Sequence, residues 1–255
     1  MNTTMKQGDF TGLAKDYAMS RPDYSATLLR ALLGVAQART VADVGAGTGI
    51  WSRMLAESGL DCHAVEPCGD MRKEGKTHTA RLNVEWHDGS AEATGLADRQ
   101  VDWVTMASSF HWTDPAKSLH EFHRILIPGG SLTVLWNPRN ISGHPLHEEI
   151  EQMIHDMVPN LKRVSSGNSK HTSDWKEVLI STGHFNNVIF MEANHEIAMS
   201  QERYLRAWRS VNDIQAQAGP ELFDIIMARI GERIKHLDKV VVPYKTRAWT
   251  VRARD

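Results

Sequence analysis

The sequence has few cysteines, no long apolar run and no large excess of either charge. Its two cysteines, Cys62 and Cys68, offer neither a disulfide framework nor the spacing of a zinc site. No apolar run approaches the ~18 residues of a membrane-spanning helix, and the N-terminal residues hold no apolar signal core. These absences predict a cytoplasmic protein with no membrane partner.

The charge balance also says little in favour of a nucleic-acid partner. The formal net charge is −2 over 255 residues, with 24% charged and 41% hydrophobic residues. Nucleic-acid binders usually present a strongly basic surface, so we expect none here. A chain of this length is large enough to bury a sizeable core. The expected partner is a small-molecule substrate, and the expected state is a monomer or homodimer.

Apolar runs typical of buried strands alternate with helical patterns through the first half of the chain. The expected strands are 41–44, 62–66, 83–87, 101–107 and 131–136, and the expected helices between them are 49–58 and 115–126. Such alternation predicts an α/β fold with a parallel sheet and helices on both faces.

The second half is less regular. Helical patterns at 147–157, 174–182, 201–217 and 221–237 surround a predicted strand at 188–193, and a last strand is expected at 246–252. We interpret residues 140–170 and 195–240 as helical insertions that form a cover over the carboxyl edge of the sheet. A small-substrate pocket would form beneath such a cover.

A glycine loop follows the first predicted strand. Glycines at 45, 47 and 49 let the backbone approach a ligand, and the next helix presents free amides at its start. The dinucleotide-binding pattern requires another glycine where this chain has Ile50. Asp43, inside the strand, would repel a pyrophosphate but attract the cationic amino group of a methionine. The loop therefore favours a methionine-containing nucleotide.

Acidic residues end the next two strands. Glu66 lies 21 residues after Gly45, where a carboxylate can accept hydrogen bonds from a ribose diol, although it could also be a surface carboxylate. Residues 86–92 end the third strand, on the side expected to face an adenine ring. Asp88 in this run could cap a helix instead.

Five motifs occur in order along the chain: VADVGAGTG at 41–49, AVEP at 64–67, GSAE at 89–92, SFHW at 109–112 and RILIPGG at 124–130. Together they resemble class I S-adenosylmethionine-dependent methyltransferases. Residues 17–24, 136–140 and 242–247 resemble the small-molecule branch that includes trans-aconitate methyltransferase-like proteins. The resemblance implies a Rossmann-like, seven-stranded, mostly parallel sheet. It also implies methyl transfer from S-adenosylmethionine, with release of S-adenosylhomocysteine.

The resemblance also assigns cofactor contacts by position. In this assignment Glu66 holds the ribose, Met71 packs on the adenine, and Ser108 lies under the sulfonium. The full set of cofactor-binding predictions is Tyr17, Arg21, Asp43, Gly45, Ala46, Gly47, Gly49, Glu66, Pro67, Met71, Ser90, Ala91, Ala107 and Ser108. We expect a single domain over 1–255, with an N-terminal lid and helix (1–38), a cofactor-binding core (39–140), and a helical cover with the last strands (141–255).

Methyl transfer from a sulfonium is an in-line displacement that depends mainly on alignment and exclusion of water. The predicted catalytic residue is His111, whose ordinary pKa of ~6.5 suits proton acceptance at neutral pH. It could instead shape the pocket by packing or hydrogen bonding. The predicted substrate-binding residues are Tyr24, His111, Trp112, Asn137 and Arg139.

Each of these assignments has a structural alternative. Arg21 could form an ion pair within the protein, and Trp112 could belong to the core. Asn137 and Arg139 could stabilise loops.

Other classes of function fit the residues less well. The histidine pairs 120/123 and 144/147 lack a third ligand nearby, so no metal site is predicted. Asp43 and Ile50 argue against the alternative of an NAD-dependent oxidoreductase. A non-catalytic regulatory protein that binds S-adenosylmethionine stays open. The acceptor atom, whether O, N or C, is not specified by the sequence.

Overall fold

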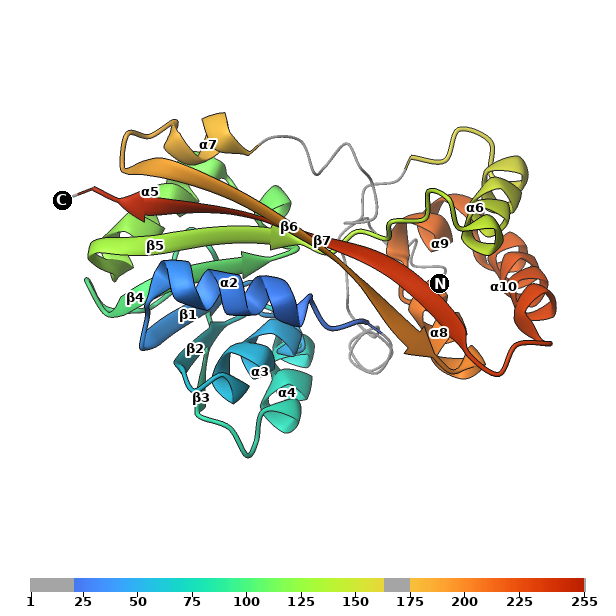
Figure 1. The fold of residues 1–255 in the computed structure, drawn as a ribbon, viewed down its shortest axis with the longest axis horizontal. Coiled ribbons are helices and arrows are strands. Elements are labelled where there is room, and N and C mark those ends of the chain that lie inside the picture. Colours follow the sequence, from blue (N-terminus) through green and yellow to red (C-terminus); the bar gives the residue numbers. More distant parts are fainter. Residues whose placement is uncertain (1–20, 163–174, 255) are drawn as a thin grey trace, which may run out of the picture. The chain divides into compact units, whose positions relative to one another are not determined.

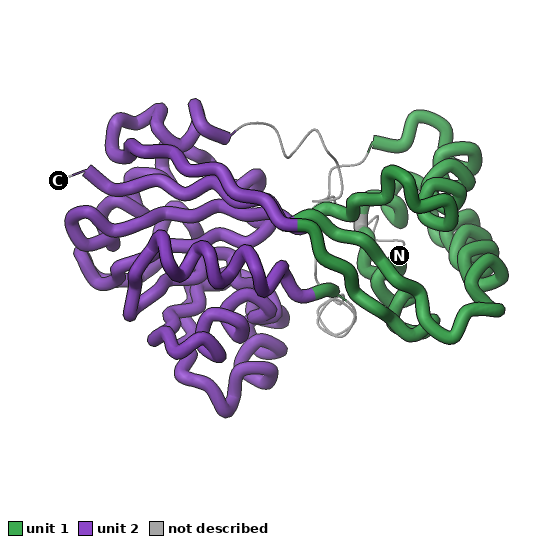
Figure 2. The backbone as a smooth tube through the Cα atoms, viewed as in Figure 1, with its two compact units in different colours: residues 1–22, 138–169, 194–245 green, residues 23–137, 170–193, 246–255 purple. Residues whose placement is uncertain are grey.

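The computed structural model describes residues 21–162 and 175–254 (Figure 1). The chain forms two compact units, shown in Figure 2. The sheet unit comprises residues 23–137, 170–193 and 246–255, and the helical unit comprises 1–22, 138–169 and 194–245. The prediction of a single domain, with a cover over the sheet edge, is not tested by this division and stays a prediction. Tyr17 lies outside the described residues.

The sheet unit contains a seven-stranded sheet in the order β3-β2-β1-β4-β5-β7-β6. Strands β1 to β5 pair in parallel, and β7 runs antiparallel to β5. The strands are β1 (Thr40–Val44), β2 (Asp61–Val65), β3 (Val84–His87), β4 (Val101–Ala107), β5 (Leu126–Trp136), β6 (Phe185–Met199) and β7 (Val240–Ala253). The predicted Rossmann-like, mostly parallel sheet of seven strands is confirmed.

Helices pack on both faces of this sheet. One face is covered by α2 (Ala26–Ala36) and α3 (Ile50–Glu57), and the other by α5 (Pro115–Ile125) and α7 (Lys176–Ile180). Successive strand residues point to opposite faces, so Trp103 joins the core under α2 and α3 while Val104 joins the core under α5 and α7. Burial on both faces explains why the parallel strands appear as nearly continuous apolar runs.

One helix beside the glycine loop was not predicted from the sequence. Helix α4 (Gly69–His78) is polar over most of its length, and among its residues only Met71 and Gly75 are buried. The absence of an apolar stripe left it without a periodic signal. Gly75 packs directly against the ring of Trp86, which comes from β3.

The helical unit has its own core. It contains α6 (Pro145–Met157), α8 (Gln201–Arg209), α9 (Asn212–Ala218) and α10 (Pro220–Ile234). The prediction of one helix over 201–217 was wrong, because Val211 adopts an extended conformation that separates α8 from α9. The bounds predicted for the last two strands were too short. Both β6 and β7 continue from the sheet unit into the helical unit.

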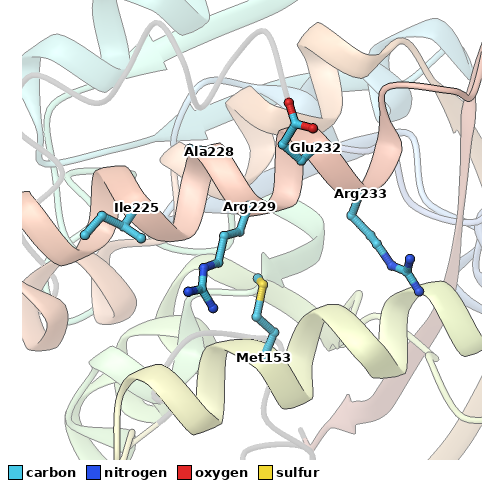
Figure 3. Close-up of a pocket in the computed structure, with 6 residues that line it drawn as sticks. All are labelled: Met153, Ile225, Ala228, Arg229, Glu232 and Arg233. Atoms are coloured by element: carbon cyan, nitrogen blue, oxygen red, sulfur yellow. The ribbon is translucent and has the colours of Figure 1, made fainter.

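A hollow lies between α6 and α10 in the helical unit, and Figure 3 shows its lining. Its residues are Met153, Ile225, Ala228, Arg229, Glu232 and Arg233. None of them was predicted to bind cofactor or substrate. Within the described ranges, no helix is both long and apolar enough to cross a membrane.

Candidate active site

The glycine loop is fixed to the end of the neighbouring strand. The backbone amides of Gly45 and Ala46 both donate to the carbonyl oxygen of Val65, over 2.8 and 3.1 Å. Gly45 has a φ of +68°, and a Cβ there would lie 2.7 Å from Ser109 Oγ. A side chain at position 45 would therefore strain the backbone and force Ser109 to shift. Residues 45–47 keep a partly exposed backbone, which a ligand can approach.

The Glu66 carboxylate lies against this loop. One oxygen, Oε2, accepts a hydrogen bond from the amide of Gly47 (2.8 Å), and Oε1 accepts one from the amide of Cys68 (2.9 Å). Burial raises the pKa of Glu66, and these two hydrogen bonds offset part of that rise. A carboxylate has about four lone-pair sites, so two stay available for further donors such as ribose hydroxyls. The ribose contact itself stays a prediction.

Arg72 joins the ends of two strands and was missed by the sequence analysis. Its guanidinium donates to the carbonyl oxygen of Glu66 and pairs with Asp88, over 2.5 and 2.9 Å. The side chain of Asp88 therefore has a guanidinium partner at the end of β3. The only sequence signal for Arg72 is its position about one turn after the start of α4. That helix was itself not predicted, because it lacks an apolar period.

Asp43 lies fully buried within the sheet unit. Ser52 Oγ donates to its Oδ2 over 2.6 Å, and Thr105 Oγ1 donates to its Oδ1 over 3.3 Å. Burial raises the pKa of this carboxyl to about 7, although the two hydroxyl hydrogen bonds partly oppose the rise. The Asp43 side chain thus connects β1 to α3 and β4. Its predicted contact with a methionine ammonium group stays a prediction.

The remaining cofactor predictions differ in exposure. Met71 and Ala91 are buried, Ser90 is half-buried, and Pro67 is exposed. The structure neither supports nor contradicts their assigned contacts with the nucleotide, and these assignments stay predictions.

The end of β4 holds a residue in an uncommon conformation. Ser108 has a φ of +58°, and its amide donates to the carbonyl oxygen of Leu135 over 2.7 Å. Tyr24 donates its hydroxyl to Ser108 Oγ over 3.0 Å. Non-glycine residues with positive φ are uncommon and concentrate at functional sites. The structure thus brings together two predicted site residues, Tyr24 and Ser108.

His111 lies in the short helix η1 (Phe110–Trp112), just after β4. The indole nitrogen of Trp136 donates to His111 Nδ1 over 3.2 Å. Because an indole N–H can only donate, Nδ1 must be the accepting nitrogen, and the neutral ring carries its proton on Nε2. Trp136 was not predicted as a site residue. The feature that could have identified Trp136 is its position at the end of β5, the strand that pairs with β4.

The Trp112 side chain lies beside His111, with the two ring centroids 4.6 Å apart. Trp112 is 46% exposed, so the alternative that it belongs to the core is wrong. Its role in binding substrate stays a prediction.

The side chain of Asn137 forms hydrogen bonds with two other segments of the sheet unit. Its Nδ2 donates to the carbonyl oxygen of Asp23 over 3.1 Å, and its Oδ1 accepts from Thr246 Oγ1 over 2.8 Å. These bonds connect the end of β5 to β7 and to the segment before α2. They favour the loop-stabilising alternative for Asn137.

Arg139 and Arg21 belong to the helical unit. The guanidinium of Arg139 lies over the ring of Trp208, 3.9 Å from its centroid, and 3.7 Å from a carboxylate oxygen of Glu151. Arg21 donates to the carbonyl oxygen of Ser210 over 3.0 Å. Both arginines therefore have partners within the protein, and their contacts with substrate or cofactor stay predictions.

Comparisons with known proteins find similarity to methyltransferases. Residues 42–134 match a family model described as a methyltransferase domain. An uncharacterized methyltransferase of Mycobacterium tuberculosis (strain ATCC 25618 / H37Rv) is 40% identical over 127 residues, which cover 49% of this chain and 50% of the relative. The alignment with that relative thus spans about half the length of each protein.

Two solved structures share the fold. A candidate type II methyltransferase from Anaeromyxobacter dehalogenans has a TM-score of 0.62 at 21% identity, covering 92% of this chain and 97% of that one. The Haemonchus contortus phosphoethanolamine N-methyltransferase 2, in complex with S-adenosyl-L-methionine, has a TM-score of 0.55 at 15% identity, covering 98% and 58%. At these identities they establish the fold. Residues 42–134, which contain the glycine loop, Glu66 and His111, are therefore similar to a methyltransferase domain.

Proposed function

We propose that this chain transfers a methyl group from S-adenosylmethionine to an O, N or C atom of a small molecule, and releases S-adenosylhomocysteine. The observation that carries the proposal is the contact between Glu66 and the amide of Gly47. It places a nearly buried carboxylate directly against a glycine loop that leads into a helix. This loop and this acidic residue lie within the segment that matches a methyltransferase domain.

The residues at this edge of the sheet fit the cofactor. Glu66 has two lone-pair sites left for the ribose diol, and the backbone of the partly exposed residues 45–47 can lie close to the methionine end. The sulfonium supplies an electrophilic methyl group when the cofactor is bound. The relative from Haemonchus contortus, which has the same fold, was solved with S-adenosyl-L-methionine.

The chain's own residues supply alignment and exclusion of water. Tyr24 and Ser108 are hydrogen-bonded where β4 ends, the position that the resemblance assigns to the sulfonium. Proton acceptance at His111 Nδ1 would break the hydrogen bond from Trp136. We therefore assign His111 a role in shaping the pocket that orients the acceptor, and not in accepting a proton at Nδ1.

The finer assignments rest on the sequence. The trans-aconitate methyltransferase-like branch is proposed from residues 136–140 and 242–247, together with residues 17–24, of which 17–20 lie outside the described ranges. The cytoplasmic location and the monomeric or homodimeric state are likewise predictions.

Calorimetry on the full chain tests the choice of cofactor. We expect saturable binding of S-adenosylmethionine and S-adenosylhomocysteine, and none of NAD. Binding of NAD without either sulfur nucleotide would overturn the proposal.

A second measurement tests catalysis. Small metabolites grouped by class are incubated with the protein and S-adenosylmethionine, and release of S-adenosylhomocysteine is followed. Release above the background without acceptor supports the enzyme. Binding of both sulfur nucleotides, with no release for any class, would favour the non-catalytic regulatory alternative.

A further inference from the structure

Two histidines and a glutamate gather on one face of the outermost strands of the sheet unit. His63 comes from β2, and Glu85 and His87 come from β3. His63 pairs in register with Glu85, and His87 lies two residues further along the same strand. Alternate residues of a strand share a face, so all three side chains project from the same side of the sheet.

The donor atoms are already close together. His63 Nδ1 lies 3.1 Å from His87 Nε2 and 3.5 Å from Glu85 Oε2, while His87 Nε2 lies 3.8 Å from Glu85 Oε1. Ligands at ~2.0–2.2 Å from a tetrahedral zinc ion lie about 3.3–3.5 Å from one another. The separations of His63 Nδ1 from His87 Nε2 and from Glu85 Oε2 match this arrangement within a few tenths of an ångström, and one donor atom from each of the three residues lies within 4.8 Å of the other two. A metal ion thus requires only small side-chain rotations.

We propose that His63, Glu85 and His87 form a binding site for one zinc-type divalent transition-metal ion, which bridges β2 and β3. Two imidazole nitrogens and one carboxylate oxygen make a donor set that such ions prefer, with a fourth position left for water. In the metal-free chain, the 3.1 Å hydrogen bond between His63 Nδ1 and His87 Nε2 requires a proton on one of these two inward nitrogens. When the ion binds, that ring moves its proton to its outward nitrogen, which is Nε2 in His63 and Nδ1 in His87. Neutral rings therefore change tautomer without a net loss of protons.

The surroundings favour a cation. Asp61 and Glu85 both act on His63 with negative charge. On the far side of the His63 ring, Nε2 is 3.5 Å from Gln100 Nε2, too long a contact to fix the position of the ring proton.

The chain contains a second histidine group that serves as a matched control. His120 Nδ1 lies 3.3 Å from His184 Nε2, much as the two rings of the proposed site lie together. A third histidine of this group, His123, forms a hydrogen bond between its Nε2 and the carbonyl oxygen of Arg254. Among the described residues, only the group of His63, Glu85 and His87 brings three ligand atoms within 4.8 Å of one another.

The experiment titrates the full chain, freed of metal with a chelator, with zinc chloride in a calorimeter, and follows cobalt(II) binding by its visible absorption. We expect one ion per chain and a tetrahedral cobalt spectrum. His87→Gln and His63→Gln should each weaken binding by more than the ~10–100-fold that loss of an outer-shell partner costs. The double variant His120→Gln/His184→Gln should bind as the parent does.

Glu85→Gln provides an independent test that does not disturb folding, because the Glu85 side chain is 69% exposed. It should also weaken zinc binding, with an unchanged circular dichroism spectrum. Absence of stoichiometric zinc or cobalt binding by the parent would overturn the proposal. So would binding that survives the changes at 63, 85 and 87 but disappears in the 120/184 variant.

Discussion

The indole N–H of Trp136 donates to Nδ1 of His111, and the two nitrogens are 3.2 Å apart. Trp136 is fully buried at the end of β5, where it stacks on Trp175 with ring centroids 4.9 Å apart. The donor is thus held rigidly, and it selects one tautomer of the histidine. This contact determines what His111 can do in the proposed reaction, because a nitrogen that accepts from an indole has no free lone pair for a substrate proton.

The first prediction concerns this tautomer. Nitrogen-15 NMR of the histidine rings should find Nδ1 of His111 unprotonated and Nε2 protonated at pH values above the ring's own titration. Trp136→Phe removes the indole donor and should redistribute the proton between the two nitrogens. Trp249→Phe is the control, since Trp249 packs edge-on against Trp136. A protonated Nδ1 in the parent would refute the tautomer and the role assigned to His111 on its basis.

The second prediction concerns turnover, once an acceptor is identified. His111→Ala should lower the rate of methyl transfer and leave the affinity for S-adenosylhomocysteine within a few-fold. The contrast is expected because the side chain of His111 is hydrogen-bonded to Trp136 of β5, whereas the glycine loop is hydrogen-bonded to Glu66. An unchanged rate would remove His111 from the catalytic machinery, and a large loss of cofactor affinity would reassign it to the cofactor site.

The third prediction tests Glu66. Glu66→Ala should weaken binding of S-adenosylhomocysteine by ~1.5–3 kcal/mol, the contribution typical of hydrogen bonds to a charged group. The change also leaves the amide of Gly47 without its carboxylate acceptor. Glu57→Ala is the control, since its side chain is half-exposed and pairs with Arg53 one helical turn away. Equal calorimetric affinities for the two variants would place Glu66 outside the cofactor site.

Much of the sheet could be predicted because the inner parallel strands are largely buried on both faces, whereas β3 has no buried residue. That burial produces the apolar runs from which β1, β2, β4 and the end of β5 were predicted. The predicted bounds of β6 were too short because half-buried and exposed residues alternate along most of this strand. Such positions carry no apolar run. Helix α4 was missed for a related reason, since it has only two buried residues.

The features of the candidate site also differ in whether the sequence could predict them. The glycine loop and Glu66 could be predicted because their chemistry depends on spacing along the chain. The contact between Trp136 and His111 depends on β4 lying beside β5 in the sheet, which residue spacing does not specify. The group formed by His63, Glu85 and His87 depends on a register between strands, and local periodicity within either strand contains no trace of it.

The fourth prediction tests the packing of α4 against β3. A Cβ added at Gly75 would overlap the ring of Trp86, which is held by a hydrogen bond from its Nε1 to Thr79 Oγ1. Gly75→Ala should therefore lower the free energy of unfolding by ~1–3 kcal/mol, as overpacking does. Gly34→Ala in α2 is the control, because nothing lies within 4 Å of its added Cβ. That change should stabilise the protein by ~0.5–1 kcal/mol, because alanine favours helix. Equal effects in urea denaturation would contradict the assigned packing.

The fifth prediction follows from the buried carboxyl of Asp43. Burial raises its pKa from 3.8 to about 7, so between these pH values the folded chain holds a proton that the unfolded chain has lost. The contribution of Asp43 to the free energy of unfolding is therefore complete below pH ~4, is lost as the pH rises towards 7, and is constant above that value. Its size is of the order of 4 kcal/mol at most.

Asp43→Asn isolates this contribution, because asparagine imitates the neutral carboxyl in shape and cannot ionise. Relative to the parent, the variant should gain stability steadily from pH 5 to pH 7 in urea denaturation. Asp102→Asn is the control. Burial tends to raise the pKa of Asp102, but hydrogen bonds from the amides of Thr40 and Arg39 outweigh it and lower that pKa. Asp102 thus stays ionised across this range, and its variant should run parallel to the parent. If the curve for Asp43→Asn also runs parallel to that of the parent, then the pKa of Asp43 in the folded chain is close to its ordinary value, and this prediction is wrong.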